Sequence, residues 1–379
     1  MKELREIVNA YDTAKNAGKE CVLATIVHLE GSSYRRPGAR MLVLEDGAMI
    51  GAISGGCLEG DALVKALLTF SEKKSRVITY DTSDEDDATI GVQLGCEGVI
   101  QVLFEYINKE DSNNPVELLR KSISTRQEAA LVTYYDLSDK RAGQEGACLL
   151  QLEDGTRFGR NPFIQFDASL QNDIAEVFLS KTSRFIEHSN DEYITHTFIE
   201  YLEVPLSLVI VGAGNDAIPV MQLAEILGWE VRIVDGRKTH AKQDRFISAC
   251  QVLVSKPEAV LQQIDIDSRT CFVLMTHNFL YDLQMLKALI QTSIPYIGVL
   301  GPKKKLTKLL QQIKEEGNEV SDEMLSRIYG PIGLDIGAET PEEIAASIIS
   351  EIQAVFTNRK GGMLKWKKET IHSNRPLAD

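Results

Sequence analysis

Two cysteines lie in glycine-bounded turns, a setting in which a thiol can become reactive. Cys57 directly follows Gly55 and Gly56 and precedes a helical segment, and Cys96 directly follows another glycine. A helix N-terminus and the N–H groups of a glycine turn favour the thiolate over the thiol. A small cysteine buried in a tight turn would show the same pattern. We therefore treat Cys57 and Cys96 as candidate catalytic thiols, and sequence spacing leaves open whether they meet in space.

Basic residues precede the first of these turns. Arg35 and Arg36 lie in a turn that ends in Pro-Gly, and Arg40 opens the first strand of a hairpin whose Asp-Gly turn is a strong hairpin signal. Arginine in a turn often faces solvent, but three arginines within six residues of a glycine-rich loop favour anion binding. Ser54, Gly55 and Gly56 form the Ser-Gly-Gly turn itself, so we add all three to the candidate binding residues.

A dinucleotide-fold fingerprint begins after a strand in the second half of the chain. Gly212 permits a tight turn, Gly214 lets a pyrophosphate approach the backbone, and Ala217 lets the following helix pack closely on the strand. Asp235 ends the next strand and is placed to accept hydrogen bonds from a ribose. The pattern predicts the Rossmann-like fold, whereas occupancy by NAD is a separate question because folds outlast their ligands.

One histidine occupies a position where open α/β folds bind ligands. His277 directly follows a strand predicted at 270–275, and therefore lies at the carboxyl edge of the sheet. A histidine that orders this loop is as consistent with the sequence as one that contacts a ligand. We keep His277 among the candidate binding residues.

The elements around these residues predict an α/β protein. Strands predicted at 250–254, 270–275 and 294–299 alternate with helices, and the closing helix starts at a Thr-Pro-Glu-Glu capping box. This pattern indicates a C-terminal Rossmann-like domain with a doubly wound parallel sheet, preceded by a mixed α/β domain in which 107–205 carries no motif with assignable chemistry. The predicted domains are 1–205, with 1–108 and 109–205 as candidate subdomains, 206–358, and a basic tail at 359–379.

Composition limits the class of partner. The 379 residues carry 55 acidic and 41 basic side chains, a net charge of −14, which argues against nucleic acid or an anionic membrane as the main partner. No run approaches the roughly 18 apolar residues of a membrane span, and the N-terminus reads as an amphipathic helix rather than a signal peptide. We expect a cytoplasmic protein whose six scattered cysteines are free thiols.

Seven ordered blocks resemble the XdhC/CoxI family of xanthine dehydrogenase accessory proteins. They read GSSYRRPGARMLV, SGGCLEGD, LGCEGVIQVL, LVIVGAGNDA with VRIVDGR, MTHNFLYDLQML, YIGVLGPKKK and PIGLDIGAETPEEIAASIISEI. The resemblance implies a maturation factor rather than a classical enzyme. Such a factor binds the molybdenum cofactor (molybdopterin), supports its sulfuration by a cysteine desulfurase, and inserts it into a molybdenum hydroxylase apoenzyme of the xanthine dehydrogenase type. A homodimer is a further expectation from the family.

The resemblance also assigns roles to residues. Cys57 matches the cysteine of the SGGC block, as a ligand of molybdenum in the cofactor or as a persulfide carrier, because thiolate is the soft ligand that molybdenum and sulfane sulfur prefer. Cys96 matches a second family cysteine, but Glu97 stands beside it where glycine is usual, and a carboxylate disfavours a thiolate. Asn278 replaces a usual aspartate, which puts an acid–base role of that block in doubt. The matching binding residues are Arg35, Arg36, Arg40, Gly212, Gly214 and Asp235.

Two other functions fit parts of the sequence. The Rossmann fingerprint and His277 are compatible with an NAD(P)-dependent oxidoreductase, for which NAD would be the cofactor. A non-catalytic scaffold between cysteine desulfurase and apoenzyme would need neither thiol. Nucleotide binding and cofactor retention distinguish these alternatives from the maturation factor.

Overall fold

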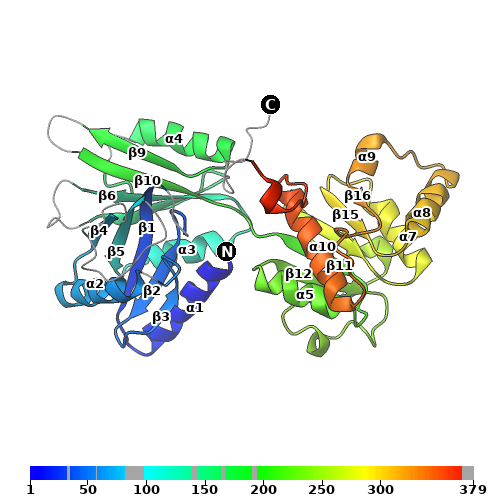
Figure 1. Ribbon diagram of the computed structural model, residues 1–379, viewed down its shortest axis with the longest axis horizontal. Coiled ribbons are helices and arrows are strands. Elements are labelled where there is room, and N and C mark those ends of the chain that lie inside the picture. Colours follow the sequence, from blue (N-terminus) through cyan, green and yellow to red (C-terminus); the bar gives the residue numbers. More distant parts are fainter. Residues whose placement is uncertain are drawn as a thin grey trace. The chain divides into compact units, whose positions relative to one another are not determined.

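The computed structural model divides into two compact units, Met1–Val204 and Pro205–Asp379 (Figure 1). The residues that it describes are 1–31, 35–56, 58–81, 98–137, 144–163, 167–189 and 194–368. Within those ranges no helix combines the length and the apolar character that crossing a membrane requires. Each unit has its own sheets and its own hydrophobic clusters.

The N-terminal unit contains two five-stranded antiparallel sheets. Their strand orders are β3-β2-β1-β5-β4 and β8-β7-β6-β10-β9. The elements of the first half are α1 (Lys2–Asn16), β1 (Cys21–Gly31), β2 (Arg40–Leu44), β3 (Met49–Gly51), α2 (Glu59–Glu72), β4 (Arg76–Asp81) and β5 (Gly98–Tyr106). Those of the second half are α3 (Pro115–Ser124), β6 (Ala129–Tyr135), β7 (Gly146–Leu152), β8 (Arg157–Gly159), α4 (Asp167–Ser180), β9 (Arg184–Ser189) and β10 (Ile194–Leu202).

The two halves repeat one motif. Each runs helix, three strands, helix, two strands, and each sheet has the order third, second, first, fifth, fourth. The β2–β3 and β7–β8 hairpins even share sequence, Leu-Glu-Asp-Gly at 44–47 and again at 152–155, with a glycine four residues later in both. The aspartate of each turn accepts a hydrogen bond from the N–H two residues on, at 3.1 Å in the first turn and 2.8 Å in the second. This repeat was not predicted from the sequence.

Side-chain alternation along the strands builds the core of the unit. Val22, Ala24 and Ile26 of β1 pack under α2, and the alternate residues Cys21 and Leu23 face a core shared with α1, α3 and the second sheet. Helix α4 covers the outer face of the second sheet in the same way. The inner faces of both halves therefore form one continuous core, as expected of a two-residue strand period.

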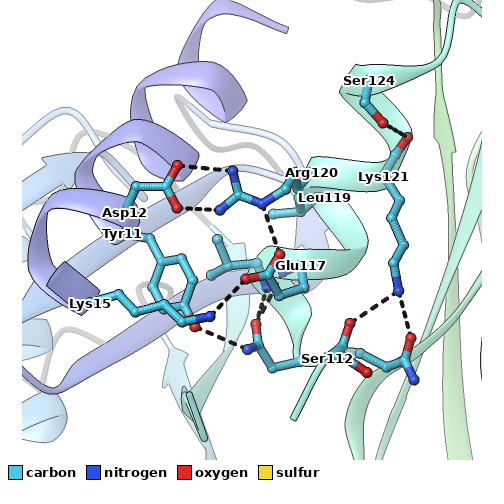
Figure 2. Close-up of polar contacts among 12 residues, drawn as sticks. Tyr11, Asp12, Lys15, Ser112, Glu117, Leu119, Arg120, Lys121 and Ser124 are labelled. Carbon is cyan, nitrogen blue, oxygen red and sulfur yellow. Dashed lines mark hydrogen bonds and ion pairs between the residues drawn. The ribbon is translucent and has the colours of Figure 1, made fainter. Parts of the chain in front are cut away.

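Polar contacts join α1 and α3, the first helices of the two halves (Figure 2). Arg120 of α3 donates two hydrogen bonds to the Asp12 carboxylate on α1, at 2.9 and 2.5 Å. Lys15 lies 3.3 Å from Glu117, and the Tyr11 hydroxyl accepts a hydrogen bond from the side chain of the α3 N-cap residue. These contacts fix α1 against α3 at one side of the shared core.

Each sheet of the N-terminal unit supplies one glutamate whose side chain contacts a strand of the other sheet. Glu200 on β10 pairs with Arg40 on β2, and Glu105 on β5 accepts a hydrogen bond from the Ala147 N–H on β7 at 2.7 Å. Both approaches need a glycine, since a Cβ on Gly38 or Gly146 would lie 2.4 or 2.1 Å from the glutamate oxygen. The two glutamates differ in charge balance, because in the part of the chain that the structure describes Glu200 forms an ion pair with an arginine and Glu105 forms none.

The pH dependence of the free energy of unfolding should reveal the difference between Glu105 and Glu200. Burial raises the pKa of Glu105 to about 7, against the opposing effects of the Ala147 N–H and the charge of Arg40. A carboxyl with a raised folded-state pKa favours the folded state below its unfolded pKa, and that contribution is lost as the pH rises through about 7. As the pH rises from 5 to 8, we expect the free energy of unfolding of Glu105→Gln to increase relative to that of wild type by on the order of 3 kcal/mol. Urea unfolding of both proteins at these two pH values measures the difference, and a constant difference would contradict the expectation.

The C-terminal unit is a Rossmann-like domain. Its six strands are all parallel in the order β13-β12-β11-β14-β15-β16, which is the order of the doubly wound dinucleotide-binding fold and confirms the predicted fold class. Its strands are β11 (Ser207–Val211), β12 (Glu230–Asp235), β13 (Gln251–Val254), β14 (Thr270–Leu274), β15 (Tyr296–Val299) and β16 (Ile328–Tyr329). Its α-helices are α5 (Ala217–Ile226), α6 (Pro257–Val260), α7 (Phe279–Leu289), α8 (Lys303–Glu315), α9 (Asp322–Ser326) and α10 (Pro341–Phe356).

Helices cover both faces of this sheet (Figure 1). Leu208 and Ile210 of β11 pack in one cluster with α5 and α10, whereas Val209 and Val211 pack in the other with α7 and α8. The predicted capping box of α10 is present, with Thr340 and its partner three residues later hydrogen-bonded both ways. The very short strands β8 and β16 were not predicted.

Candidate functional site

The Ser-Gly-Gly turn of the N-terminal unit is held by its own side chains. Ser54 is buried, its hydroxyl donates to the Glu59 carboxylate, and it accepts hydrogen bonds from the N–H groups of Gly56 (3.1 Å) and Leu58 (3.0 Å). Burial alone would raise the pKa of Glu59, but the hydrogen bonds from Ser54 outweigh it, so this pKa lies below its ordinary value. These two N–H groups are engaged within the turn, unlike the free donors expected from the sequence. Cys57, which follows, lies outside the described residues, as does Cys96.

The three candidate arginines differ in what they contact. Arg40 is 1% exposed and forms a two-point ion pair with Glu200, with Arg40 Nη1 3.0 Å from Oε1. This pairing commits its guanidinium to the fold, which differs from the phosphate contact suggested by the sequence. Arg35 pairs with Glu3 of α1 and is partly exposed, and Arg36 is exposed. The exposed part of the basic turn is therefore Arg35 and Arg36.

A crevice of about 620 Å³ opens at the carboxyl ends of β11, β12 and β14 in the C-terminal unit. This is the switch point of the strand order, where doubly wound sheets bind ligands. Its volume is in the range of small-molecule and cofactor sites. Its lining residues are Gly214, Asn215, Asp216, Arg237, Thr239, His240, Arg245, His277 and Pro341.

The fingerprint glycines shape the floor of this crevice. Gly212 has φ +127°, and a Cβ there would lie 2.4 Å from the Met275 carbonyl oxygen, so only glycine fits between β11 and β14. Gly214 lines the crevice, and Ala217 begins α5 with no exposed surface. The roles predicted for Gly212 in the tight turn and for Ala217 in close packing are confirmed.

Asp235 has partners inside the protein. Its carboxylate accepts hydrogen bonds from the Ala213 N–H (2.8 Å) and from Arg237 Nε and Nη2 (3.0 and 2.7 Å), and the residue is 3% exposed. Burial alone would raise the pKa of Asp235, but the hydrogen bonds from Arg237 and Ala213 hold it below its ordinary value. Both oxygens are thus used to join β12 to the Gly212 turn, and neither is directed to a ribose in this arrangement. Asp235 instead positions the Arg237 guanidinium on the crevice wall.

A second arginine is fixed on the same wall. Arg245 donates from Nη1 to the carbonyls of Ala213 (2.8 Å) and His240 (2.7 Å), and from Nη2 to Asn215 Oδ1 (2.8 Å). It thereby ties the loop after β12 to the fingerprint turn. Arg237 and Arg245 were not predicted from the sequence, although the first stands only two residues after Asp235.

His277 lies at the crevice in a strained backbone conformation. Its φ is +56°, its side chain is 70% exposed, and its Nε2 hydrogen-bonds to Asp216 Oδ2 at 2.9 Å. The loop is held from below by Thr276, which donates to the buried Asp282 at 2.6 Å, and Lys305 donates to the same carboxylate at 2.6 Å. Strained residues persist where the surroundings over-determine them, frequently at functional sites.

The polar residues near His277 stabilise the local structure. Asn278 caps α7 by accepting hydrogen bonds from the N–H groups of Leu280 and Tyr281, which explains a polar side chain at that position without acid–base chemistry. Lys305, in the YIGVLGPKKK block, donates hydrogen bonds to Asp282 and to the Leu300 carbonyl.

The crevice is suited to an anionic ligand. Two fixed arginines and two histidines line it, against the single carboxylate of Asp216, and the N-terminus of α5 adds the positive end of a helix dipole. A phosphate group on a cofactor fits this donor set. Within the described ranges no cluster of three or more histidine, cysteine or acidic side chains could hold a metal ion by itself.

Comparison with known proteins places the chain in a family. A model of the XdhC Rossmann domain matches residues 208–352, and a model of the XdhC and CoxI family matches residues 14–81. A protein from Bacillus subtilis that is named as a probable xanthine dehydrogenase subunit is 32% identical over 334 residues, covering 88% of this chain and 92% of that one. The chain belongs to the XdhC and CoxI family. This confirms the resemblance described from the sequence blocks.

Two further relatives of the family cover nearly the whole chain. The molybdenum cofactor insertion chaperone PaoD from Escherichia coli is 25% identical over 351 residues, covering 93% of this chain and 88% of that one. A crystal structure of a xanthine dehydrogenase from Bacillus halodurans is similar with a TM-score of 0.72 and 29% identity, covering 94% of this chain and 97% of that one. Similarity to these two proteins therefore extends over both units.

Proposed function

We propose that this protein is a maturation factor that binds the molybdenum cofactor, supports its sulfuration, and inserts it into a molybdenum hydroxylase apoenzyme of the xanthine dehydrogenase type. The observation that carries the proposal is the match, over 93% of the chain, to a relative named a molybdenum cofactor insertion chaperone. The anion-binding character of the crevice agrees with it, because the pterin of this cofactor carries a phosphate. A cysteine desulfurase as the sulfur source and a homodimer are part of the proposal.

The residues of the crevice would hold a phosphate group of the cofactor. Arg237 and Arg245 supply fixed guanidinium groups, and Asp216 orients His277 toward the same space. Because these arginines are already held by protein acceptors, little side-chain entropy is lost when a phosphate binds. The bound cofactor would supply the metal at which sulfur is exchanged.

The N-terminal unit carries the proposed thiols. We propose that Cys57 contributes a thiolate to molybdenum, with Cys96 as a second thiol, since thiolate is the soft ligand that suits this metal. Arg35 and Arg36 remain proposed anion contacts of the neighbouring basic turn. Ser54 stabilises the turn before Cys57 through the N–H groups of Gly56 and Leu58.

Retention of the cofactor tests the proposal. The full chain, purified from cells that synthesise the cofactor, is expected to carry molybdenum and pterin in equal amounts. Cys57→Ala should lose most of the metal, and His277→Gly should weaken binding roughly tenfold by removing one charged or polar contact. Metal analysis and pterin fluorescence measure both quantities.

Two matched variants control for unspecific damage. Cys250→Ala removes an exposed thiol elsewhere, and Asn358→Gly relieves a positive φ of 53° away from the crevice, as His277→Gly does within it. Both controls should retain the cofactor at wild-type levels. Full retention by Cys57→Ala would overturn the role of this cysteine, and absence of molybdenum from the wild type would favour the scaffold.

The NAD(P)-dependent oxidoreductase is the alternative with a structural argument. The fold is that of nucleotide-binding domains, but Asp235 has both oxygens engaged by Ala213 and Arg237. Calorimetric titration with NAD and NADP separates the two functions. We expect no heat of binding, and tight binding of either nucleotide would support the oxidoreductase.

A further inference from the structure

The repeat of the N-terminal unit makes Cys148 the counterpart of Arg40. Both residues stand eleven positions before the last glycine of their hairpin, and that glycine faces their carbonyl in each half. A Cβ on Gly51 would lie 2.4 Å from the Arg40 oxygen, and one on Gly159 would lie 2.1 Å from the Cys148 oxygen. A bulge in β7 leaves Cys148 between the residues paired with Val132 and Thr133. By chain position, Cys148 thus stands where the first half has the arginine, while the bulge places Ala147 opposite Thr133 and packs Cys148 against the cluster under α4.

Cys148 cannot replace the charge of Arg40. Burial raises its pKa, so the side chain is a neutral thiol, and its Sγ donates to the Val132 carbonyl at 3.8 Å. Glu105 is the counterpart of Glu200 and is 3% exposed. Among the described residues, the Ala147 N–H is the one hydrogen-bond donor to its carboxylate. A buried carboxylate without a cation is costly when charged.

A cavity of about 260 Å³ lies beside this carboxylate, and we call it the β7 cavity. Its acidic lining residues are Glu105, Asp111 and Glu145, and the single arginine that lines it in the described chain, Arg160, has a side chain that is 78% exposed and lies 3.6 Å from Glu145. The wall at Asn114 is fixed, because its side-chain amide donates to the Tyr11 hydroxyl on α1 and to two backbone carbonyls. The β7 cavity is therefore a rigid, acidic space.

We propose that the β7 cavity binds a small guanidinium-bearing molecule, whose N–H groups pair with Glu105 as those of Arg40 pair with Glu200. The buried carboxylate, the acidic lining and the missing arginine all point to a cation with several donors in a plane. The volume is smaller than that of a drug-sized site and suits a guanidinium head with a short chain. The raised pKa of Glu105 agrees, because burial outweighs the opposing effects of the Ala147 N–H and the charge of Arg40.

Titration with a matched pair of small molecules tests the site. The probes are n-butylguanidinium and n-butylurea, which have similar shape and differ in charge. At pH 8 the full-length protein is expected to bind n-butylguanidinium with one molecule per chain by calorimetry, and to give no heat with n-butylurea. Equal binding of both probes, or none of n-butylguanidinium at millimolar concentration, would overturn the proposal.

Two variants of the full chain tie binding to the site. Glu105→Gln should weaken binding about tenfold or more, since it removes the charge that pairs with the cation. Cys148→Arg should abolish binding, because it supplies the guanidinium that the first half already has. Glu110→Gln, on an exposed residue of the neighbouring loop, and Cys250→Arg, at an exposed cysteine of the other unit, should bind like wild type. Unchanged binding by folded Glu105→Gln, checked by circular dichroism, would contradict the assignment even if Cys148→Arg fails to fold.

Discussion

Replacing Arg40 by methionine is expected to lower the free energy of unfolding by about 3–5 kcal/mol, because it leaves a buried carboxylate without its cation. Glu200 is 8% exposed, and the Arg40 guanidinium contacts both of its oxygens. Methionine keeps most of the apolar stem, so the loss reports the ion pair rather than a large cavity. Urea unfolding followed by far-ultraviolet circular dichroism measures the effect.

A double-mutant cycle separates the pair from its surroundings. Arg40→Met combined with Glu200→Met should recover most of the lost stability, since exchange of a buried ion pair for apolar residues is often neutral. Arg36→Met changes an exposed arginine of the turn that precedes β2 and should alter stability by less than about 0.5 kcal/mol. A loss below about 1 kcal/mol in Arg40→Met would show that Glu200 finds another partner or a proton.

Gly212→Ala is expected to destabilise the C-terminal unit by about 3 kcal/mol or more, because two penalties add. The alanine must adopt φ +127°, and its Cβ would meet the backbone of Met275 at 2.4 Å, which cannot move without displacing β14. Both tryptophans of the chain, Trp229 and Trp366, lie in this unit, so tryptophan fluorescence during urea unfolding reports on it directly.

Gly317→Ala provides the matched control. Gly317 also has a positive φ, +80°, but a Cβ there meets nothing within 4 Å. It should cost about 1–2 kcal/mol, the backbone penalty alone. If the two variants lose the same stability, the close approach of β11 and β14 at Gly212 is not the constraint that the structure indicates.

The strongest local patterns predicted the C-terminal unit well. The fingerprint at Gly212 and the capping box at Thr340 act through neighbours within a few residues, so their physical meaning is contained in the sequence around them. Asn278 is a cap for the same reason. Strands of two or three residues, such as β8 and β16, carry too short a pattern to stand out from turns.

Long-range partners account for what the sequence did not reveal. The sequence predicted Arg40 to be an anion-binding residue, because its actual partner, Glu200, lies 160 positions later in the chain. Arg245 reaches the crevice only because the loop after β12 folds back to Asn215. The sequence does contain one sign of the repeat in the N-terminal unit, since Leu-Glu-Asp-Gly occurs twice. One repeated tetrapeptide becomes evidence of a structural repeat only when both sheets show the same strand order.

The duplicated N-terminal unit amounts to a dimer contained in one polypeptide. In a true homodimer every substitution appears twice, so a site and its mate must stay identical. Here the halves are free to diverge: the sequence Ser-Gly-Gly-Cys at 54–57 follows β3, and the corresponding positions 162–165 after β8 read Pro-Phe-Ile-Gln instead. The buried arginine likewise survives on one side alone. The two halves have thus diverged in sequence, with the Ser-Gly-Gly-Cys segment in the first half and Cys148 at the position of the buried arginine in the second, while each half still supplies a glutamate to the other's sheet.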